Sequence, residues 1–287
     1  MTAAPSIVWF RHDLRLADHP ALTAALADGG PILPVYVHAP DEEGDWPLGA
    51  AARWWLEASL ASLDAELRRR GSRLLLLMGP SATALSGLAR ASGARSLHFG
   101  RRYEPAAQAR DEAVTAALRS QGLRIEAYAA GLLLEPWELR TQQGGAFQVF
   151  TPFWKALQQR LPQTQPLAAP ARLPAPAAWP EGLPLEALLL SRPRLAWQDG
   201  LAGRWTVSEA AALDRLQAFA AVALSAYPQD RDRPDLDGSS CLSPYLRWGQ
   251  LSARQVWWSL KEEVARRPQG AQAATAFMRQ LAWRDFA

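Results

Sequence analysis

The first half of the chain alternates short apolar runs with longer segments in which apolar residues recur at helical spacing. Each run is short enough for a single strand, and most intervening segments are long enough for a helix. Gly71 follows the segment at 47–70 and is a typical helix C-terminal cap. Because the strands are apolar along their length, the pattern predicts a five-stranded parallel sheet covered on both faces, in a Rossmann-like α/β domain. The predicted strands are residues 6–10, 31–37, 73–78, 95–99 and 123–128.

The pattern changes after residue 130. Residues 131–162 are mixed in character, and from Pro162 to Gly200 eight prolines recur without apolar periodicity, which predicts an extended connector. Later segments show helical spacing and no strand-like alternation, at residues 208–226, 252–267 and 272–286. The sequence therefore predicts an α/β domain, a connector and the start of an all-α domain, at residues 1–130, 131–204 and 205–287.

Composition narrows the class of protein. At 287 residues and 49% hydrophobic, the chain can bury one large core or two ordinary ones. Its single cysteine excludes an internal disulfide and fits a reducing compartment. We find no secretory signal and no apolar run of membrane length, so we expect a cytoplasmic protein without membrane contact. The net charge of +3 permits nucleic-acid binding without requiring it, and the four histidines lack metal-ligand spacing, so we expect no metal.

A charged loop with a serine cluster stands before one of the later helices. The Asp-Gly pair at 237–238 favours a turn, and Pro244 favours the first turn of a helix. Ser239, Ser240 and Ser243 would then lie where hydroxyls and unbonded backbone N–H groups meet at a helix N-terminus. That arrangement suits a diphosphate. The alternative is that Ser243 is only an N-cap.

Four stretches together resemble the photolyase/cryptochrome family. They are IVWFRHDLRLADHPAL (Ile7–Leu22), FTPFWKAL (Phe150–Leu157), YPQDRDRPDLDGSSCLSPYLRWGQLSAR (Tyr227–Arg254) and FMRQLAWRDF (Phe277–Phe286). The first is similar to the opening strand and loop of the family, the second to its interdomain segment, and the last two to its FAD-binding half. Because they occur in the order of the family, the resemblance implies an FAD-dependent protein with an all-α cofactor domain behind the α/β domain.

The resemblance implies roles for residues of the last two stretches. It places Tyr227 against FAD, and it places the diphosphate on Ser239, Ser240, Cys241, Leu242 and Ser243. The final helix would line the same pocket, since three- and four-residue spacing puts its matching positions on one face; these are Phe277, Gln280, Leu281 and Arg284. For Phe277 and Leu281 the alternative is ordinary core packing. Cys241 fits a small filler better than a nucleophile.

Two residues are implied contacts to DNA. Trp283 matches the family position that stacks on an extruded pyrimidine pair, and Arg231 matches a contact to the DNA backbone. The alternative for Arg231 is a surface ion pair with a neighbouring aspartate (230, 232 or 235). Gln280 would share the catalytic site with Trp283, but it departs from the glutamate of repair members. A neutral amide can hydrogen-bond a base edge and cannot donate a carboxylic proton.

Family members often carry an antenna chromophore in or beside the α/β domain. Where folate-binding members have an Asn-Glu pair, this chain has alanines at 106 and 107. This difference argues against a methenyltetrahydrofolate antenna. A deazaflavin, another chromophore or no antenna stay open.

The resemblance implies light-driven, FAD-dependent repair of pyrimidine dimers in DNA, by electron transfer from reduced flavin. The partner would be dimer-containing DNA, and the full-length protein would be a monomer. Family members continue well beyond the WRDF segment, so we expect a C-terminally truncated form that retains FAD weakly and is inactive alone. The alternatives are a cryptochrome-type blue-light photoreceptor and a non-enzymatic chromophore- or nucleotide-binding module. The lesion, a cyclobutane dimer or a (6-4) product, stays open.

Overall fold

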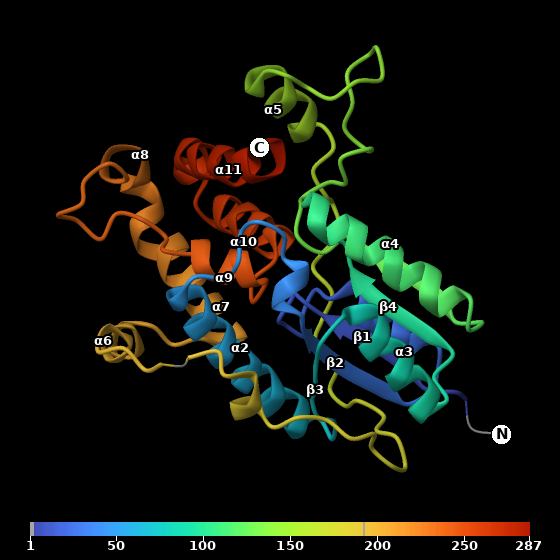
Figure 1. The fold of residues 1–287 in the computed structure, drawn as a ribbon. Helices are drawn as coiled ribbons and strands as arrows, with labels where there is room; N and C mark the ends of the chain where they lie inside the picture. The colour runs from blue at the N-terminus through green and yellow to red at the C-terminus, as the bar shows by residue number, and fades with distance from the viewer. Residues whose placement is uncertain (1–2, 192) are drawn as a thin grey trace. The chain divides into compact units, whose positions relative to one another are not determined.

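The computed structural model describes residues 3–191 and 193–287, which form two compact units (Figure 1). Each unit combines segments that are distant in the sequence. Unit 1 contains the chain up to Ala130, Leu167–Glu209 and Trp248–Gln250, and unit 2 contains Gly131–Pro166, Ala210–Arg247 and Leu251–Ala287.

The predicted connector, residues 131–204, is not a separate part of the structure. Its first part belongs to unit 2 and its second part to unit 1. In the second part, the carbonyl of Pro174 accepts from the N–H of Ile32, and the N–H of Leu183 donates to the carbonyl of Leu76, both at 2.8 Å. Main-chain bonds of this kind leave no apolar periodicity in the sequence, which is why the pattern did not assign this segment to the α/β unit.

Unit 1 is built on a five-stranded parallel sheet with strand order β3-β2-β1-β4-β5. The order reverses beside β1, where Trp9 pairs with Val35 of β2 on one side and with Phe99 of β4 on the other. This sheet confirms the predicted fold class, and the strands begin and end within one or two residues of the predicted limits. The strands are β1 (Ser6–Phe10), β2 (Ile32–His38), β3 (Leu75–Met78), β4 (Ser96–Gly100) and β5 (Arg124–Tyr128).

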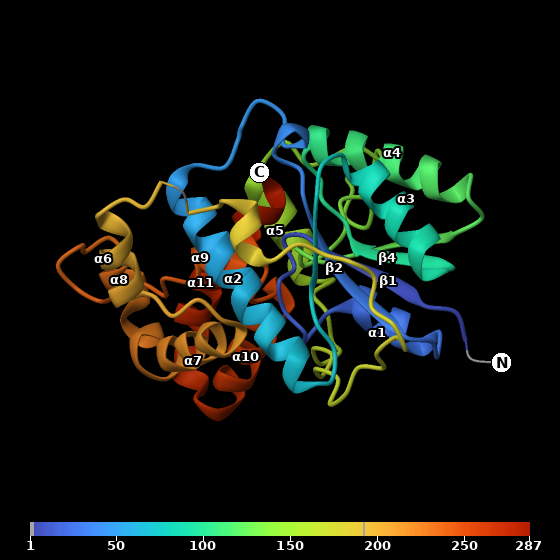
Figure 2. The ribbon, with the colours of Figure 1, turned by 60° about the horizontal axis from the view of Figure 1, so that its bottom comes forward.

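Helices cover both faces of this sheet (Figures 1 and 2). Trp9 and Phe99 point to the face covered by α3 and α4, where they join the apolar core with Leu85 and Val114. The alternate strand positions point the other way, toward α1, because successive side chains of a strand face opposite sides. The helices of this unit are α1 (Pro20–Ala27), η1 (Pro40–Glu42), α2 (Ala50–Arg69), α3 (Ser81–Ser92), α4 (Pro105–Arg119), η2 (Leu185–Leu188) and α6 (Trp197–Arg204).

The loop after β1 is buried although it is rich in charge. Arg15 is 1% exposed, and its guanidinium donates to the carbonyls of Asp18, Ala130 and Gly249. Glu209 accepts hydrogen bonds from two backbone N–H groups of the same loop, at 2.7 and 2.9 Å. A buried charge is tolerated when such bonds replace its hydration. The charged loop after β1 therefore holds distant segments of unit 1 together through hydrogen bonds.

Unit 2 carries the helical second half that the sequence predicts. The chain is helical from Glu209 to Asp230 in successive α, π and 3-10 turns, four residues beyond the predicted end at 226. A capping box opens α10, in which Ser252 and Gln255 each bond the backbone N–H of the other, at 2.9 and 2.8 Å. The helical elements are α5 (Phe150–Gln158), α7 (Glu209–Ala218), η3 (Phe219–Ala223), η4 (Leu224–Ala226), α8 (Tyr227–Asp230), α9 (Ser243–Trp248), α10 (Ala253–Arg266), η5 (Pro268–Gly270) and α11 (Ala271–Phe286).

Two kinds of feature are missing from the described part of the chain. None of its helices combines the length and the apolar character that a bilayer crossing requires. Within residues 3–191 and 193–287, no three His, Cys, Asp or Glu side chains gather in a way that could hold a metal ion. Cys241 is a half-buried thiol without a disulfide.

Candidate cofactor and nucleic-acid site

Two positions constrain the backbone of the loop that leads into α9. Gly238 is buried against Asp230, and an added Cβ would lie 2.5 Å from the Asp230 side chain and 2.8 Å from its carbonyl oxygen, so only glycine fits. Cys241 has φ +52°, in the left-handed region that residues with a side chain seldom adopt. The following Leu242 is buried and holds the loop against unit 2. The turn predicted at 237–238 is not there: the hydrogen-bonded turn lies a few residues earlier, where the N–H of Leu236 donates to the carbonyl of Arg233 at 3.3 Å. Residues 239–243 follow Gly238 as one short arc.

The three serines of this arc differ in exposure. Ser239 and Ser243 are exposed, whereas half-buried Ser240 accepts a hydrogen bond from the backbone N–H of Leu242 at 3.4 Å. α9 begins at Ser243 with Pro244 in its first turn, as predicted. Exposed hydroxyls and neighbouring backbone N–H groups are the donors that phosphate oxygens accept from. The arc therefore fits a diphosphate both in chemistry and in access.

Tyr227 and Phe277 lie together in an aromatic cluster with Phe219. The three ring centroids are 4.7 to 5.6 Å apart, and Tyr227 and Phe277 are 6% and 7% exposed. Burial raises the pKa of the Tyr227 hydroxyl. Leu281, one turn beyond Phe277, is also buried. Phe277 and Leu281 are therefore packed in the core of unit 2, which is the alternative stated for them above. Tyr227 belongs to the same core because its ring packs against Phe277.

The other predicted positions of α11 are on its exposed side. Gln280, Trp283 and Arg284 are all exposed, and Trp283 keeps 43% of its surface accessible. Phe277 and Leu281 point into the unit instead. The face of α11 that was predicted to line one pocket is therefore divided along its length. Phe277 and Leu281 are buried in unit 2, and Gln280 and Arg284 are exposed to solvent. The structure brings Gln280, Trp283 and Arg284 together on one accessible strip.

One face of Trp283 is covered by Phe150 of α5. The two rings are stacked, with centroids 3.9 Å apart and an interplanar angle of 6°, and Phe286 meets the indole edge-on at 5.4 Å. The guanidinium of Arg279 lies 5.8 Å from the Phe150 ring. At about 100° per residue, Arg279 and Phe286 flank Trp283 on one side of the helix, and Gln280 lies on the other. Sequence reasoning noted Phe150 only within the FTPFW segment and missed this pairing.

Asp285 anchors α11 to the segment that opens unit 2. Its Oδ2 accepts a hydrogen bond from the backbone N–H of Leu133 at 2.7 Å, and the N–H of Leu134 also bonds to this carboxyl. Its buried Oδ1 has no hydrogen-bond partner among the described residues. Burial raises the pKa of Asp285 to about 7, despite these donors and the charge of Arg284. Nothing in the sequence pattern distinguished this aspartate from a surface one.

Arg231 forms a surface ion pair with a neighbouring aspartate, which is the alternative stated for it above. Its Nε lies 3.4 Å from Oδ1 of Asp232, and its guanidinium lies 5.6 Å from the centroid of the Tyr227 ring. The side chain is still one-third exposed. An exposed ion pair of this length is weak, so the guanidinium can exchange Asp232 for another anion.

A second opening lies in unit 1 at the carboxyl end of β2. This cavity of about 300 Å³ is lined by Tyr36, His38 and Glu43, among others. Glu43 accepts hydrogen bonds at 3.1 to 3.2 Å from the guanidinium groups of Arg102 and Arg110. Burial would raise the pKa of Glu43, but the two arginines outweigh burial and hold that pKa below its usual value. Burial lowers the pKa of His38 and raises that of Tyr36, so both side chains favour the neutral form.

Known proteins resemble this chain along its whole length. A family model described as DNA photolyase matches residues 6–176. The deoxyribodipyrimidine photo-lyase of Agrobacterium fabrum is 38% identical over 286 residues, which cover 100% of this chain and 59% of that protein. Cryptochrome-1 of Arabidopsis thaliana is 32% identical over 298 residues, which cover 98% of this chain and 42% of that protein.

A solved structure agrees with these matches. The crystal structure of a bacterial class III photolyase from Agrobacterium tumefaciens superposes with a TM-score of 0.93 at 37% identity, over 100% of this chain and 58% of that one. The chain therefore spans less than two thirds of the length of these relatives.

Proposed function

The chain belongs to the DNA photolyase family, and we propose that it supplies DNA-facing and cofactor-binding elements of a deoxyribodipyrimidine photo-lyase. Such an enzyme repairs pyrimidine dimers in DNA with light. The observation that carries this proposal is Trp283, which is accessible and stacked on Phe150 so that its indole plane is fixed. Stacking of one nucleobase on such a ring contributes about 1–3 kcal/mol.

The neighbours of Trp283 suit an extruded base pair. Gln280 can donate to and accept from a base edge with its amide. Phe150 covers the indole on the side of Arg279, so the base would stack on the side of Gln280. In this proposal Gln280 and Trp283 act on the lesion, and Arg231 and Trp283 contact DNA.

FAD is the cofactor that we propose for unit 2. Its diphosphate would lie on the arc of Ser239, Ser240, Cys241, Leu242 and Ser243, where the hydroxyls of Ser239 and Ser243 are exposed and that of Ser239 lies 3.4 Å from the Cys241 sulfur. When bound in its reduced form, FAD supplies light-driven electron transfer. The remaining residues proposed at the cofactor are Tyr227, Phe277, Gln280, Leu281 and Arg284. Because Tyr227, Phe277 and Leu281 are buried, they would act by holding α11 and α8 in place beside the cofactor.

We also propose that the cavity at the carboxyl end of β2 takes an accessory chromophore such as a deazaflavin. In open α/β sheets, ligands bind outside the carboxyl ends of the strands, and this cavity of about 300 Å³ lies there. Its neutral Tyr36 and His38 side chains would contact a ring. A rise in melting temperature on addition of a deazaflavin, absent in Tyr36→Ala, tests this placement.

Binding to damaged DNA tests the main proposal. We would measure binding of the full chain to a labelled oligothymidylate in the dark, before and after ultraviolet irradiation of the oligonucleotide. We expect tighter binding of the irradiated form, and we expect Trp283→Ala to remove that preference. Trp46→Ala, at an indole that is 88% exposed in unit 1, is the matched control and should leave it unchanged. Equal binding of both oligonucleotides by the unaltered chain would refute the proposal.

A cryptochrome-type photoreceptor is the second candidate, because cryptochrome-1 of Arabidopsis thaliana is 32% identical to this chain. The two candidates differ in what light does to the bound dimer. With reduced FAD and blue light, a photo-lyase restores intact thymidines, whereas a photoreceptor leaves the dimers in place. Chromatography of the oligonucleotide after illumination separates these outcomes.

A further inference from the structure

The helical segment that leads to Tyr227 changes its winding twice. α7 is followed by η3 (Phe219–Ala223), which is a π turn, then by η4, a 3-10 turn, and α8 begins at Tyr227. The N–H of Leu224 bonds to the carbonyl of Phe219, five residues earlier, as a π turn requires. Single π turns inside α-helices are rare, and they are frequent at functional sites. This one stands shortly before the tyrosine that the proposed function places at FAD.

The π turn affects the direction in which Tyr227 points. In a regular α-helix, residues eight positions apart lie about 80° apart around the axis. Phe219 and Tyr227 are eight apart, yet their ring centroids are 5.6 Å apart, and both rings contact Phe277. A π turn contains one residue more than an α turn, so it brings later residues back toward the face of Phe219, and the 3-10 turn of three residues reverses only part of this shift. The aromatic cluster of Phe219, Tyr227 and Phe277 therefore depends on the π turn.

Arg267, just after the end of α10, contacts the π turn from outside its own helix. Its Nη1 donates to the carbonyl of Ala221, in the middle of η3, at 3.0 Å. The same nitrogen lies 3.3 Å from Oε1 of Glu263, which is one turn earlier in α10 and has a side chain only 12% exposed. The carboxylate of Glu263 thus directs the guanidinium toward Ala221.

We propose that Arg267 is a positioning residue of the cofactor site. By holding the π turn at Ala221, it keeps Tyr227 on the face that packs against Phe277 of α11. Without this bond the turn relaxes toward regular α-helix, which rotates Tyr227 away from Phe277. Arg267 acts through η3 and makes no contact with the cofactor itself. The inference rests on the proposed function for the identity of that cofactor, FAD, and on the contacts of unit 2 for the rest.

Hydrogen exchange of the full chain without FAD tests the hold on the π turn. We expect Arg267→Met to raise the exchange rates of the amides at 219–227 by about three- to tenfold, because a hydrogen bond from a half-exposed cation contributes about that factor. Arg267→Lys keeps a cationic donor and should restore most of the protection. Unchanged rates at 219–227 in Arg267→Met, or a rise confined to the last turn of α10, would overturn the proposal.

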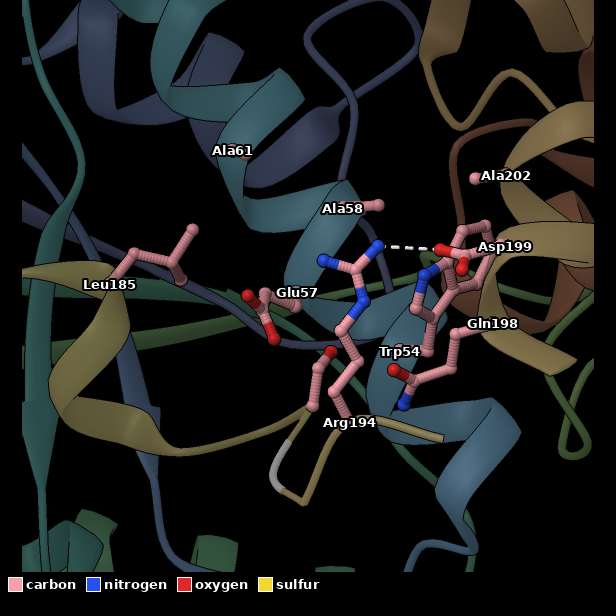
Figure 3. A pocket seen from close by; sticks show the side chains of 10 residues that line it. Trp54, Glu57, Ala58, Ala61, Leu185, Arg194, Gln198, Asp199 and Ala202 are labelled. Carbon is pink, nitrogen blue, oxygen red and sulfur yellow. Dashed lines mark hydrogen bonds and ion pairs between the residues drawn. The ribbon is translucent and has the colours of Figure 1, made fainter. Parts of the chain in front are cut away.

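Two arginines serve as controls for the loss of a surface charge. The side chain of Arg266 is 70% exposed and pairs with glutamates of its own helix, so Arg266→Met should leave exchange at 219–227 unchanged. Arg194 belongs to unit 1 and forms an ion pair with Asp199 at 2.5 Å (Figure 3). Arg194→Met should therefore also leave these rates unchanged. Faster exchange at 219–227 in both controls would show a general effect of charge and would overturn the assignment to Arg267.

The affinity for FAD, measured by flavin fluorescence, tests the consequence for the cofactor site. We expect Arg267→Met to weaken FAD binding by the same three- to tenfold factor and Arg267→Lys to retain it. An Arg267→Met protein that exchanges faster at the π turn and still binds FAD as tightly as the unaltered chain would overturn the positioning role. If the unaltered chain binds no FAD, the proposed cofactor is wrong, and the exchange rates decide separately whether Arg267 holds the π turn.

Discussion

Replacement of Asp285 by asparagine should change the way in which the stability of unit 2 depends on pH. The carboxyl accepts backbone N–H groups at one oxygen, and its buried second oxygen has no partner among the described residues. A protonated carboxyl suits this place because the hydroxyl removes the buried charge. Asparagine has the same shape and stays neutral, so Asp285→Asn keeps the acceptor for Leu133 and removes the titration.

The magnitude follows from the two pKa values of this group. Burial raises the pKa of Asp285 from 3.8 to about 7 in the folded protein. Its contribution to stability is therefore complete below the unfolded pKa, and it is lost as the pH rises through the folded one. At about 1.4 kcal/mol for each unit of pKa, the free energy of unfolding should fall by up to about 4 kcal/mol between pH 4 and pH 7.

Urea unfolding at several pH values measures this effect. We expect the difference in unfolding free energy between Asp285→Asn and the unaltered protein to grow from pH 4 to pH 7 and then to level off. Asp214→Asn, at an exposed position of α7 in the same unit, is the matched control and should give a nearly constant difference. Parallel curves for Asp285→Asn and the unaltered protein would show that this carboxyl is ionised in the folded state and would refute the reasoning.

Three further predictions follow from particular contacts. Phe150→Leu should weaken binding of irradiated oligothymidylate by about two- to tenfold, while Phe150→Tyr keeps it, because an aromatic pair contributes about 0.5–1.5 kcal/mol; fluorescence anisotropy measures both. Burial raises the pKa of Asp28, but hydrogen bonds from Arg124, His98 and two serines lower it to about 2. Asp28→Asn should therefore cost about 1–2 kcal/mol at pH 7 and remove the loss of stability as the pH falls from about 4 to about 2, measured by urea unfolding. Gly249→Ala should cost more than about 2 kcal/mol, since its φ is +68° and an added Cβ would collide with the backbone of a neighbouring loop, whereas Gly87→Ala, with nothing within 4 Å, should not destabilise.

Local pattern was sufficient to predict the sheet. The central strands are buried on both faces, so their apolar runs have sharp limits; β1 begins and ends at the predicted residues. Gly71, at φ +83°, terminates α2 as a left-handed cap, which is a signal carried by a single residue. The outer strand β5 was found by its position in the alternation, although Arg124 and Glu126 are exposed.

The candidate site was predictable only where its signals are local. The start of α9 at Ser243 was predicted because proline restricts the backbone of its own neighbours, whereas the turn expected at 237–238 lies earlier, at 233–236. Phe150 and Trp283 are far apart in the sequence and stack on each other. The spacing of apolar residues within α5 or α11 does not predict a contact between the two helices. Helical spacing placed Gln280 and Phe277 on one face, but it could not tell which edge of that face is buried.

The hydrogen bonds of buried Arg15, in the loop after β1, limit where the chain can be truncated. Its three acceptor carbonyls come from the loop itself, from the end of the α/β segment at Ala130 and from Gly249 near α9. Trp55 likewise donates to the side chain of Gln250 at 3.0 Å. A polypeptide that stops at residue 130 would keep every strand and the acceptors at Asp18 and Ala130, but it would lose the Gly249 carbonyl and the Gln250 side chain. One N–H of the buried guanidinium and the indole N–H of Trp55 would then lose the acceptors they have in unit 1. A piece of unit 1 that keeps every one of these bonds therefore has to include residues 249 and 250.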